Sequence, residues 1–244
     1  MKQRGTRTIA GLAAAALFVG AAAADERELD RHRQSVGALT YPWSSIAKLY
    51  NSIGGACTAV VIDRTHVLTA AHCLFNRRTG RFLPPGSLHV LLGYERGDYR
   101  VHAQAVRYRI GTGYDPPKRE ALAADWAVLT LGEPLPAEIR PLALAGALPT
   151  AGTPTRSAGF PQDRAHSMTA DTACHILDAV DRGRLLLHDC RTNRGSSGAP
   201  LLGGEQGRPA EILGLSVAGA IRNGVPAAIA VPATRIAREL GQEP

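Results

Sequence analysis

Short apolar segments separated by polar turns recur along the chain from residue 41 onward. Residues 60–62 and 66–69 are apolar on either side of a polar triplet, a pattern that predicts two strands joined by a turn. Other segments with the composition of strands are residues 88–93, 99–110, 126–131, 183–187, 211–217 and 227–231. Many short strands with Gly and Pro turns between them predict an all-β fold, built as barrels or as a sandwich.

Three stretches depart from this pattern. Residues 74–87 contain Asn, Pro and Gly, which predicts a loop. Residues 133–155 are rich in Pro, Gly and Ala and predict a linker between two halves of the chain. Residues 233–240 carry apolar side chains at helical spacing, which predicts one helix near the C-terminal end.

The N-terminal segment is typical of an export signal. Residues 1–7 are basic, residues 8–24 carry no charge, and Ala21 and Ala23 give the A-x-A pattern that precedes a cleavage site. A membrane anchor is the alternative, but this alanine-rich stretch is short and weakly apolar for a span of about 20 residues. We therefore expect residues 1–24 to be a cleaved signal peptide and the mature protein to be secreted or periplasmic, with no stable membrane anchor.

The rest of the composition fits a globular domain. The chain has 244 residues, 45% hydrophobic and 20% charged, which excludes a disordered protein. The formal net charge of +7 includes three basic residues of the signal, and the remaining mild excess of scattered Arg does not predict nucleic-acid binding. Residues 25–33 are charged, have no apolar face and are expected to be helical or unstructured. We expect a leader or short propeptide over residues 25–40 and the folded domain over residues 41–244.

The cysteines fit an oxidising compartment. They are Cys57, Cys73, Cys174 and Cys190. Three connectivities are possible, and we favour Cys57–Cys73 with Cys174–Cys190 because each bond would then staple one half of the chain. Loops of this size stabilise by about 3 kcal/mol each in the chain-entropy model. A zinc site is the alternative, but no C-x-x-C or H-x-x-x-H spacing supports it, so we expect no metal.

Three local sequences together carry candidate chemistry. His72 follows an apolar strand, Asp125 stands at the head of another, and Ser197 lies in the sequence Gly-Ser-Ser-Gly at residues 195–198. A serine hydroxyl is a poor nucleophile and needs an adjacent base, which a carboxylate can hold in one tautomer. Glycines permit the turn that points backbone amides at a developing oxyanion. The chain supplies base, acid and nucleophile in the order His, Asp, Ser.

Neighbouring residues of the same types are weaker candidates. Ser196 adjoins Ser197 but does not itself precede a glycine, and Asp115 lies in a Tyr-Asp-Pro-Pro turn with no apolar strand after it. His66 falls inside a predicted strand and His188 precedes an Asp-Cys pair, so we expect both to be structural. The order of the three groups also differs from the Ser, Asp, His order of α/β-hydrolases.

These segments together resemble the chymotrypsin-like (trypsin-fold) serine peptidases. Residues 69–73, Thr-Ala-Ala-His-Cys, match the histidine motif of that family, and Cys57 lies where the family places the partner of Cys73. Residues 195–200, Gly-Ser-Ser-Gly-Ala-Pro, match its serine motif G-D-S-G-G-P with two changes. The resemblance covers roughly residues 43–240.

The resemblance implies an all-β fold of two six-stranded antiparallel β-barrels with a C-terminal helix, and an active site in the cleft between the barrels. The implied bounds are residues 41–135 and 150–232 for the barrels and 233–241 for the helix. It assigns Ser197 as nucleophile, His72 as base and Asp125 as the group that orients the base. The backbone N–H groups of Gly195 and Ser197 would form the oxyanion hole, and no cofactor is needed.

Departures from the family pattern indicate a subgroup. Ser196 replaces the Asp that receives the new N-terminal amine in trypsin-type zymogens, so we do not expect that activation switch. Bacterial glutamyl-endopeptidase-like members also lack this Asp. They share a Cys-Asp-Thr run that Cys190-Arg191-Thr192 resembles, and a G-Y-P segment that Gly159-Phe160-Pro161 resembles.

The resemblance to this family also implies which residues form the primary specificity pocket. Arg191 and Thr192 are expected at one wall, and Ser216, Val217 and Gly219 at the opposite wall. A pocket for Lys or Arg would need an acid where Arg191 stands, and the histidine that helps glutamyl endopeptidases bind a carboxylate is missing at Ser216. We expect poor cleavage after Lys and Arg, with tolerance for acidic or small uncharged residues.

The resulting prediction is an exported, monomeric serine endopeptidase acting on protein or peptide substrates. A catalytically silent pseudoprotease that serves as a binding protein is one alternative. An esterase with the same triad is another, because the mechanism does not fix the acyl substrate.

Overall fold

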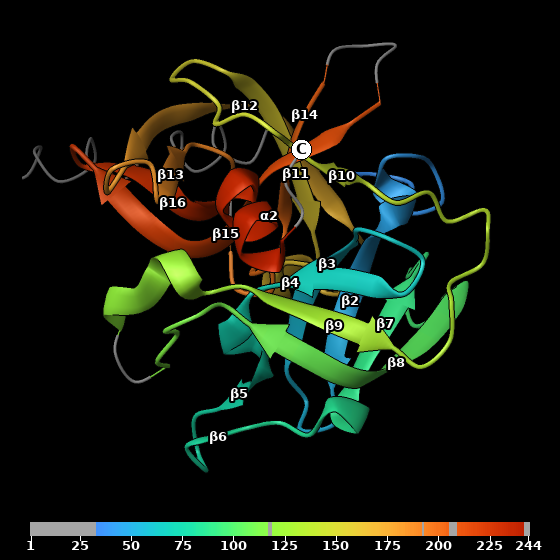
Figure 1. Ribbon diagram of the computed structural model, residues 1–244. Coiled ribbons are helices and arrows are strands. Elements are labelled where there is room, and N and C mark those ends of the chain that lie inside the picture. Colours follow the sequence, from blue (N-terminus) through green and yellow to red (C-terminus); the bar gives the residue numbers. More distant parts are fainter. Residues whose placement is uncertain (1–32, 117–118, 192, 205–208, 242–244) are drawn as a thin grey trace, which may run out of the picture.

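The computed structural model describes residues 33–116, 119–191, 193–204 and 209–241, and strands dominate this part of the chain (Figure 1). The predicted signal peptide and residues 25–32 of the predicted leader lie outside it. Short 3-10 helices are η1 (Trp43–Ser45), η2 (Ala71–Leu74), η3 (Pro85–Ser87), η4 (Arg119–Ala124) and η5 (Gln162–Arg164).

A closed antiparallel barrel forms the first half, drawn in blue to green in Figure 1, with strand order β2-β3-β4-β9-β8-β7. Its strands are β2 (Ile46–Asn51), β3 (Ala56–Val61), β4 (His66–Thr69), β7 (Leu88–Leu92), β8 (Val101–Ile110) and β9 (Ala127–Leu131). Alternation along β7 shows why the barrel closes, because Leu88, Val90 and Leu92 are fully buried whereas the side chains between them are partly exposed. A two-stranded hairpin, β5 (Phe75–Asn76) with β6 (Arg81–Phe82), occupies part of the predicted loop.

The second barrel runs β12-β11-β14-β15-β16-β13 and is closed by pairing between β12 and β13. Its strands are β11 (Pro154–Gly159), β12 (Thr169–Val180), β13 (Leu185–His188), β14 (Pro200–Gly203), β15 (Glu211–Arg222) and β16 (Val225–Pro232). Two short strands add to it: β1 (Arg33–Ser35) pairs with β12, and β10 (Ala143–Leu144) pairs in parallel with β15. The predicted fold of two six-stranded barrels is confirmed.

The helix α2 (Ala233–Leu240) ends the described chain and joins the two halves. Ile236 and Ala237 are buried, and the helix packs against β15, β16 and β10. On its other side, Arg235 Nε donates a hydrogen bond of 2.8 Å to the carbonyl of Ala123, in the segment that leads to Asp125. In the described ranges no helix combines the length and the apolar character needed to cross a membrane.

One expectation about local structure differs from the fold, and one long strand was not predicted. Residue 33 was expected in a helical or unstructured leader, but it begins β1, and the Arg33 guanidinium makes hydrogen bonds of 3.0 and 3.1 Å to the Asp163 carboxylate. Strand β12 has no apolar alternation because it carries polar residues, among them the buried Asp171, whose carboxylate binds backbone N–H groups. Strand β1 forms through pairing with β12, a distant segment, which local sequence does not reveal.

Candidate active site

His72 and Asp125 are joined by a short hydrogen bond at the edge of the first barrel. His72 lies on η2 just after β4, and Asp125 lies between η4 and β9, so antiparallel pairing of β4 with β9 brings the two together. The Asp125 carboxylate accepts one bond from His72 Nδ1 at 2.7 Å and a second from the His72 backbone N–H at 2.9 Å. Because Nδ1 faces Asp125, Nε2 is directed away from it. The carboxylate is buried, whereas the imidazole is one quarter exposed.

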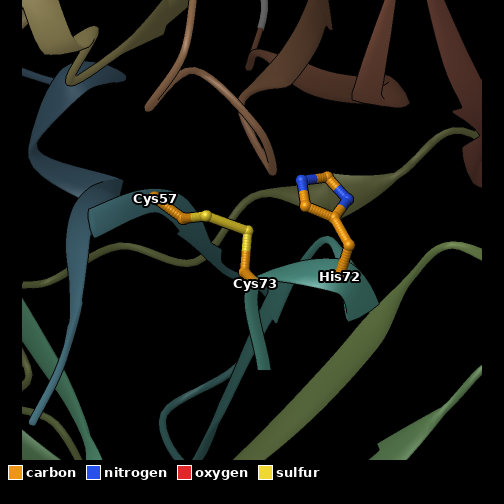
Figure 2. A group of neighbouring side chains, drawn as sticks. All are labelled: Cys57, His72 and Cys73. Atoms are coloured by element: carbon orange, nitrogen blue, oxygen red, sulfur yellow. A yellow bond between two sulfur atoms is a disulfide. The ribbon is translucent and has the colours of Figure 1, made fainter. Parts of the chain in front are cut away.

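A disulfide braces the histidine from the side. Cys57 on β3 and Cys73 on η2 form one bond and Cys174 with Cys190 the other, the pairing that the sequence analysis favoured. Figure 2 shows the imidazole of His72 next to the first disulfide. The ligand atoms of Cys57, His72 and Cys73 lie within 4.8 Å of one another, but both sulfurs are committed to the disulfide. No thiolate is therefore available to a metal while that bond is intact.

Ser197 lies in a tight loop, residues 193–198, which we call the Ser197 loop. Gly195 and Gly198 have φ angles of 93° and 84°, a conformation that residues with a Cβ rarely adopt. A Cβ at Gly195 would lie 2.3 Å from the carbonyl oxygen of Phe160, and one at Gly198 would lie 2.1 Å from that of Thr58. Both glycines are therefore required by backbone conformation and by close packing against neighbouring chain.

Hydrogen bonds fix every carbonyl in the centre of this loop. The acceptors are the carbonyl oxygens of Arg194 (from Gln162 N–H), Gly195 (from the Thr58 hydroxyl), Ser196 (from Ala199 N–H) and Ser197 (from Thr58 N–H). In a trans peptide the N–H points opposite to the preceding C=O, so fixing the carbonyls also fixes the N–H directions. Within the described residues, the N–H groups of Gly195 and Ser197 donate no hydrogen bond, whereas those of Ser196 and Gly198 do.

The two parts of the site meet through the backbone of Ser197. Cys73 Sγ lies 3.9 Å from the Ser197 carbonyl oxygen, and Thr58 next to Cys57 donates its N–H to the same oxygen at 2.9 Å. The Ser197 hydroxyl makes no hydrogen bond to the part of the chain that the structure describes, His72 included. A bound substrate often tightens such contacts, so this apo geometry is compatible with a hydroxyl and a base that act together.

Two comparisons with known proteins identify the family and the fold of the chain. The model of the trypsin-like peptidase domain matches residues 57–212. The chain belongs to this family. It is therefore a serine endopeptidase by family membership, and the match includes β3, η2, Asp125 and the Ser197 loop. A solved structure of a Glu endopeptidase superposes with a TM-score of 0.72 at 19% sequence identity, covering 86% of this chain and 96% of that one. At that identity the likeness establishes the chymotrypsin-like fold.

A groove of about 280 Å³ adjoins Ser197 in this trypsin-like peptidase. It is lined by Asn193, Arg194, Ser196, Ser197, Ser216, Val217, Ala218 and Gly219. The structure thus brings Ser216, Val217 and Gly219 together beside the nucleophile candidate. Ser216 is also tied to the Ser197 loop, since its carbonyl accepts the Gly198 N–H at 2.8 Å.

The other predicted wall of the pocket lies differently. Arg191 does not line this groove; it lines a small polar cavity with Arg33, Asp171 and Ser196, and its backbone N–H donates to Asp171 at 2.9 Å. Thr192 lies outside the described residues. The cation that does line the groove is Arg194, which sequence reasoning passed over because nothing in its local pattern distinguishes it from other exposed arginines.

Thr58 is the second residue that sequence reasoning missed. It is fully buried on β3, and its hydroxyl and backbone N–H reach two carbonyls of the Ser197 loop. In the sequence it is an ordinary strand residue after Cys57. Its position signals nothing until the two barrels are placed against each other.

The other histidines stand apart from this arrangement. His66 Nδ1 lies 2.7 Å from Asp63 on the turn between β3 and β4. His188 on β13 is fully buried, neither of its ring nitrogens has a partner in the described part of the chain, and burial lowers its pKa to about 3.

Burial, together with the nearby charge of Asp125, raises the pKa of Tyr114, so this phenol stays protonated beside the carboxylate.

Proposed function

We propose that this protein is an exported serine endopeptidase that uses Ser197, His72 and Asp125 as a catalytic triad. The observation that carries the proposal is the bonding of the Ser197 loop, in which the N–H groups of Gly195 and Ser197 donate to no described residue. Two converging donors at this place are what an oxyanion requires. The His72–Asp125 pair at 2.7 Å supports the assignment of the base and the group that orients it.

The proposed reaction proceeds through an acyl-enzyme. Ser197 Oγ attacks the scissile carbonyl carbon while His72 Nε2 takes the hydroxyl proton, and the negative charge on the former carbonyl oxygen is held by the N–H groups of Gly195 and Ser197. The C–N bond then breaks, and the proton passes from His72 to the leaving amine. Water, deprotonated by His72, attacks the ester, and the carboxylic acid leaves as Ser197 regains its proton. Asp125 keeps the Nδ1 proton in place and stabilises the imidazolium.

For specificity we propose that acidic and small uncharged residues are accepted in the groove. Arg194 lines it and makes no ion pair with a described carboxylate, so an acidic substrate side chain would meet a positive charge. Lys and Arg would be repelled by the same group. The fold likeness to a Glu endopeptidase supports the acidic half of this proposal.

Export is the remaining part of the proposal. Two disulfides are typical of proteins that fold in an oxidising compartment, and residues 1–24 have the pattern of a cleaved signal. Sequencing the N-terminus of the protein recovered from the periplasm or the medium of its host would test this: a first residue near position 25 is expected. An intact residue 1 would contradict it.

The decisive experiment compares Ser197→Ala with Ser196→Ala in a peptide-library cleavage assay. Ser197→Ala should lose nearly all activity and all labelling by a fluorophosphonate, with its melting temperature within a few degrees of wild type. Ser196→Ala is the matched neighbour and should keep labelling. A wild-type protein that takes no label would favour the pseudoprotease, and turnover of simple esters without peptide cleavage would favour the esterase.

A further inference from the structure

Thr58 connects the first barrel to the loop that carries the nucleophile candidate. Its side chain is fully buried at the start of β3. The backbone N–H of Thr58 donates to the Ser197 carbonyl at 2.9 Å, and its hydroxyl donates to the Gly195 carbonyl, also at 2.9 Å. One residue of the first barrel thus holds two carbonyls of the Ser197 loop, on either side of Ser196.

The hydroxyl of Thr58 is used as acceptor as well as donor. The Phe160 backbone N–H donates to Oγ1 at 3.1 Å, which completes a chain of hydrogen bonds from Phe160 through Thr58 to Gly195. The carbonyl of Thr58 is held in turn by the Thr69 hydroxyl at 2.7 Å. Both the donor and the acceptor capacity of this buried hydroxyl are therefore engaged, and its position is defined from several directions.

The conformation of Gly195 depends on these contacts. The carbonyl of the preceding residue is bound by Gln162 N–H at 2.5 Å, and the Gly195 carbonyl is bound by Thr58. Glycine has no Cβ to restrict rotation, so fixed peptides on both sides are what hold its φ at 93° and the direction of its N–H. The Gly195 N–H belongs to the peptide before Gly195, which Gln162 holds, whereas the Thr58 hydroxyl holds the peptide after it. Without that hydroxyl, the second peptide is held only through the Ser196 N–H, so the Gly195 Cα, and with it the direction of the Gly195 N–H, is less strictly set.

We propose that the Thr58 side chain is a positioning residue that holds the Gly195 N–H in the direction needed to stabilise the oxyanion. Its contribution is preorganisation: the donor is already aimed when charge develops, and no free energy is spent on aligning it in the transition state. This inference rests on the proposed function, because it presumes that the Ser197 loop binds a tetrahedral intermediate. Thr58 acts through Gly195 and does not itself touch the substrate.

The same strand serves both parts of the site. Cys57, the residue before Thr58, is bonded to Cys73 beside His72, whereas Thr58 is bonded to the Ser197 loop. The start of β3 thereby couples the base and the oxyanion donors to one rigid element. Placement of catalytic groups on such an element limits their relative movement.

The test compares Thr58→Val with Thr58→Ser. Valine keeps the β-branched shape and the backbone N–H but removes the hydroxyl, whereas serine keeps the hydroxyl. We expect kcat per active site, counted by fluorophosphonate titration, to fall at least about 10-fold in Thr58→Val with KM within about threefold of wild type. Thr58→Ser should retain kcat within about threefold. The affinity for a peptide aldehyde, whose adduct oxygen occupies the proposed oxyanion site, should fall in parallel with kcat/KM.

Thr155→Val is the control for lost stability. Thr155 is also buried, and its hydroxyl donates to the Leu202 carbonyl at 3.0 Å, away from the Ser197 loop. This variant should melt at a lower temperature yet keep kcat per titrated site. If Thr58→Val does not fold, Thr58→Ala removes the same hydroxyl with less steric demand and should show the same loss of kcat.

The outcomes separate the two proposals. Loss of kcat and aldehyde affinity in Thr58→Val, with rescue in Thr58→Ser, supports the positioning role. A kcat per site close to wild type in Thr58→Val, or an equal loss in Thr155→Val, overturns it while leaving the triad intact. Persistent activity and labelling in Ser197→Ala would instead overturn the proposed function on which it rests.

Discussion

The two barrels contribute to the site in different ways. In the first barrel, His72 is placed by side-chain bonds to a buried carboxylate, reinforced by the Cys57–Cys73 disulfide beside it. In the second, the position of the Ser197 loop is set by its backbone: its carbonyl groups accept hydrogen bonds from neighbouring segments, and two of its glycines have positive φ angles. One half is therefore specified by the identity of a few side chains, and the other by a conformation that many residues maintain together.

This difference predicts how each half responds to substitution. A change in the first half should remove one chemical role and leave the fold intact, because the groups concerned lie at the end of strands that pack without them. In the second half, a change should disturb the conformation first and the chemistry as a consequence.

Asp125→Asn should give the largest loss. The Asn amide would face His72 Nδ1 with a donor or force the other tautomer, so that Nε2 no longer accepts the Ser197 proton, and kcat/KM should fall about 10⁴-fold. Melting temperature should change little, which separates this loss from unfolding. The matched control is Asp63→Asn, since Asp63 and His66 form another pair at 2.7 Å outside the site. Similar losses in both variants would show that the effect is structural.

Gly198→Ala should break the second half through its conformation. The added Cβ would lie 2.1 Å from the Thr58 carbonyl oxygen and 2.5 Å from the Thr69 hydroxyl, at a φ of 84°. We expect a loss of more than about 3 kcal/mol in stability, or no folded protein. Gly219→Ala is the comparison, because a Cβ there meets nothing within 4 Å. That variant should unfold at the wild-type urea concentration but show a raised KM for bulky substrates, since Gly219 lines the groove.

The same contrast explains what the sequence could predict. The residues His72 and Asp125 are recognisable because side-chain chemistry at the ends of apolar strands leaves a pattern in the sequence. The two glycines around Ser197 do so as well. Strand alternation and turn composition predicted the all-β class and most strands of the first barrel.

What escaped prediction depends on contacts between distant segments. Strand β1 forms only because β12 offers an edge, and β12 is hidden by polar side chains that find partners in other segments. Thr58 acquires its contacts only when β3 meets the Ser197 loop. Arg194 and not Arg191 lines the groove, a difference that residue types alone do not encode.

His188 offers a test of the second barrel that is independent of catalysis. Burial lowers its pKa to about 3 in the folded state, against about 6.5 when it is exposed in the unfolded chain. As pH falls below about 6.5, His188 therefore becomes protonated in the unfolded state but stays neutral in the folded state. The free energy of unfolding then decreases by up to about 1.4 kcal/mol per pH unit until about pH 3. At pH 5 this amounts to about 2 kcal/mol.

The variant His188→Leu should remove this acid sensitivity. Urea unfolding at pH 7.5 and pH 5.0 should show a clear loss of stability in the wild type and a smaller loss in the variant. His175→Leu, which removes a half-exposed imidazole from the neighbouring strand, should retain the wild-type loss. An unchanged difference between the two pH values in His188→Leu would mean that acid acts elsewhere. His72 carries the proposed catalytic role, so activity at pH 7.5 should be the same in His188→Leu and wild type.

The smallest expected effect concerns the two arginines that the sequence and the structure place differently. Arg194 lines the groove beside Ser197, whereas Arg191 lines the cavity with Asp171. Arg194→Gln should lower the ratio of kcat/KM for glutamyl over alanyl substrates by about 3- to 10-fold, since an exposed charge contributes about 1 kcal/mol. High salt should reduce the wild-type ratio in the same direction by screening that charge.

Arg191→Gln is the matched substitution for this comparison. It should leave the glutamyl-to-alanyl ratio within about twofold, because Arg191 does not line the groove. The reverse result, a lowered glutamyl-to-alanyl ratio in Arg191→Gln and an unchanged one in Arg194→Gln, would show that Arg191 is the cation of the pocket, as the family resemblance suggests. Preferred turnover of an arginyl amide by the wild type would contradict both assignments, because either arginine would repel that side chain. The outcome thus decides whether the specificity of the second half, like its oxyanion donors, is set by the course of the Ser197 loop.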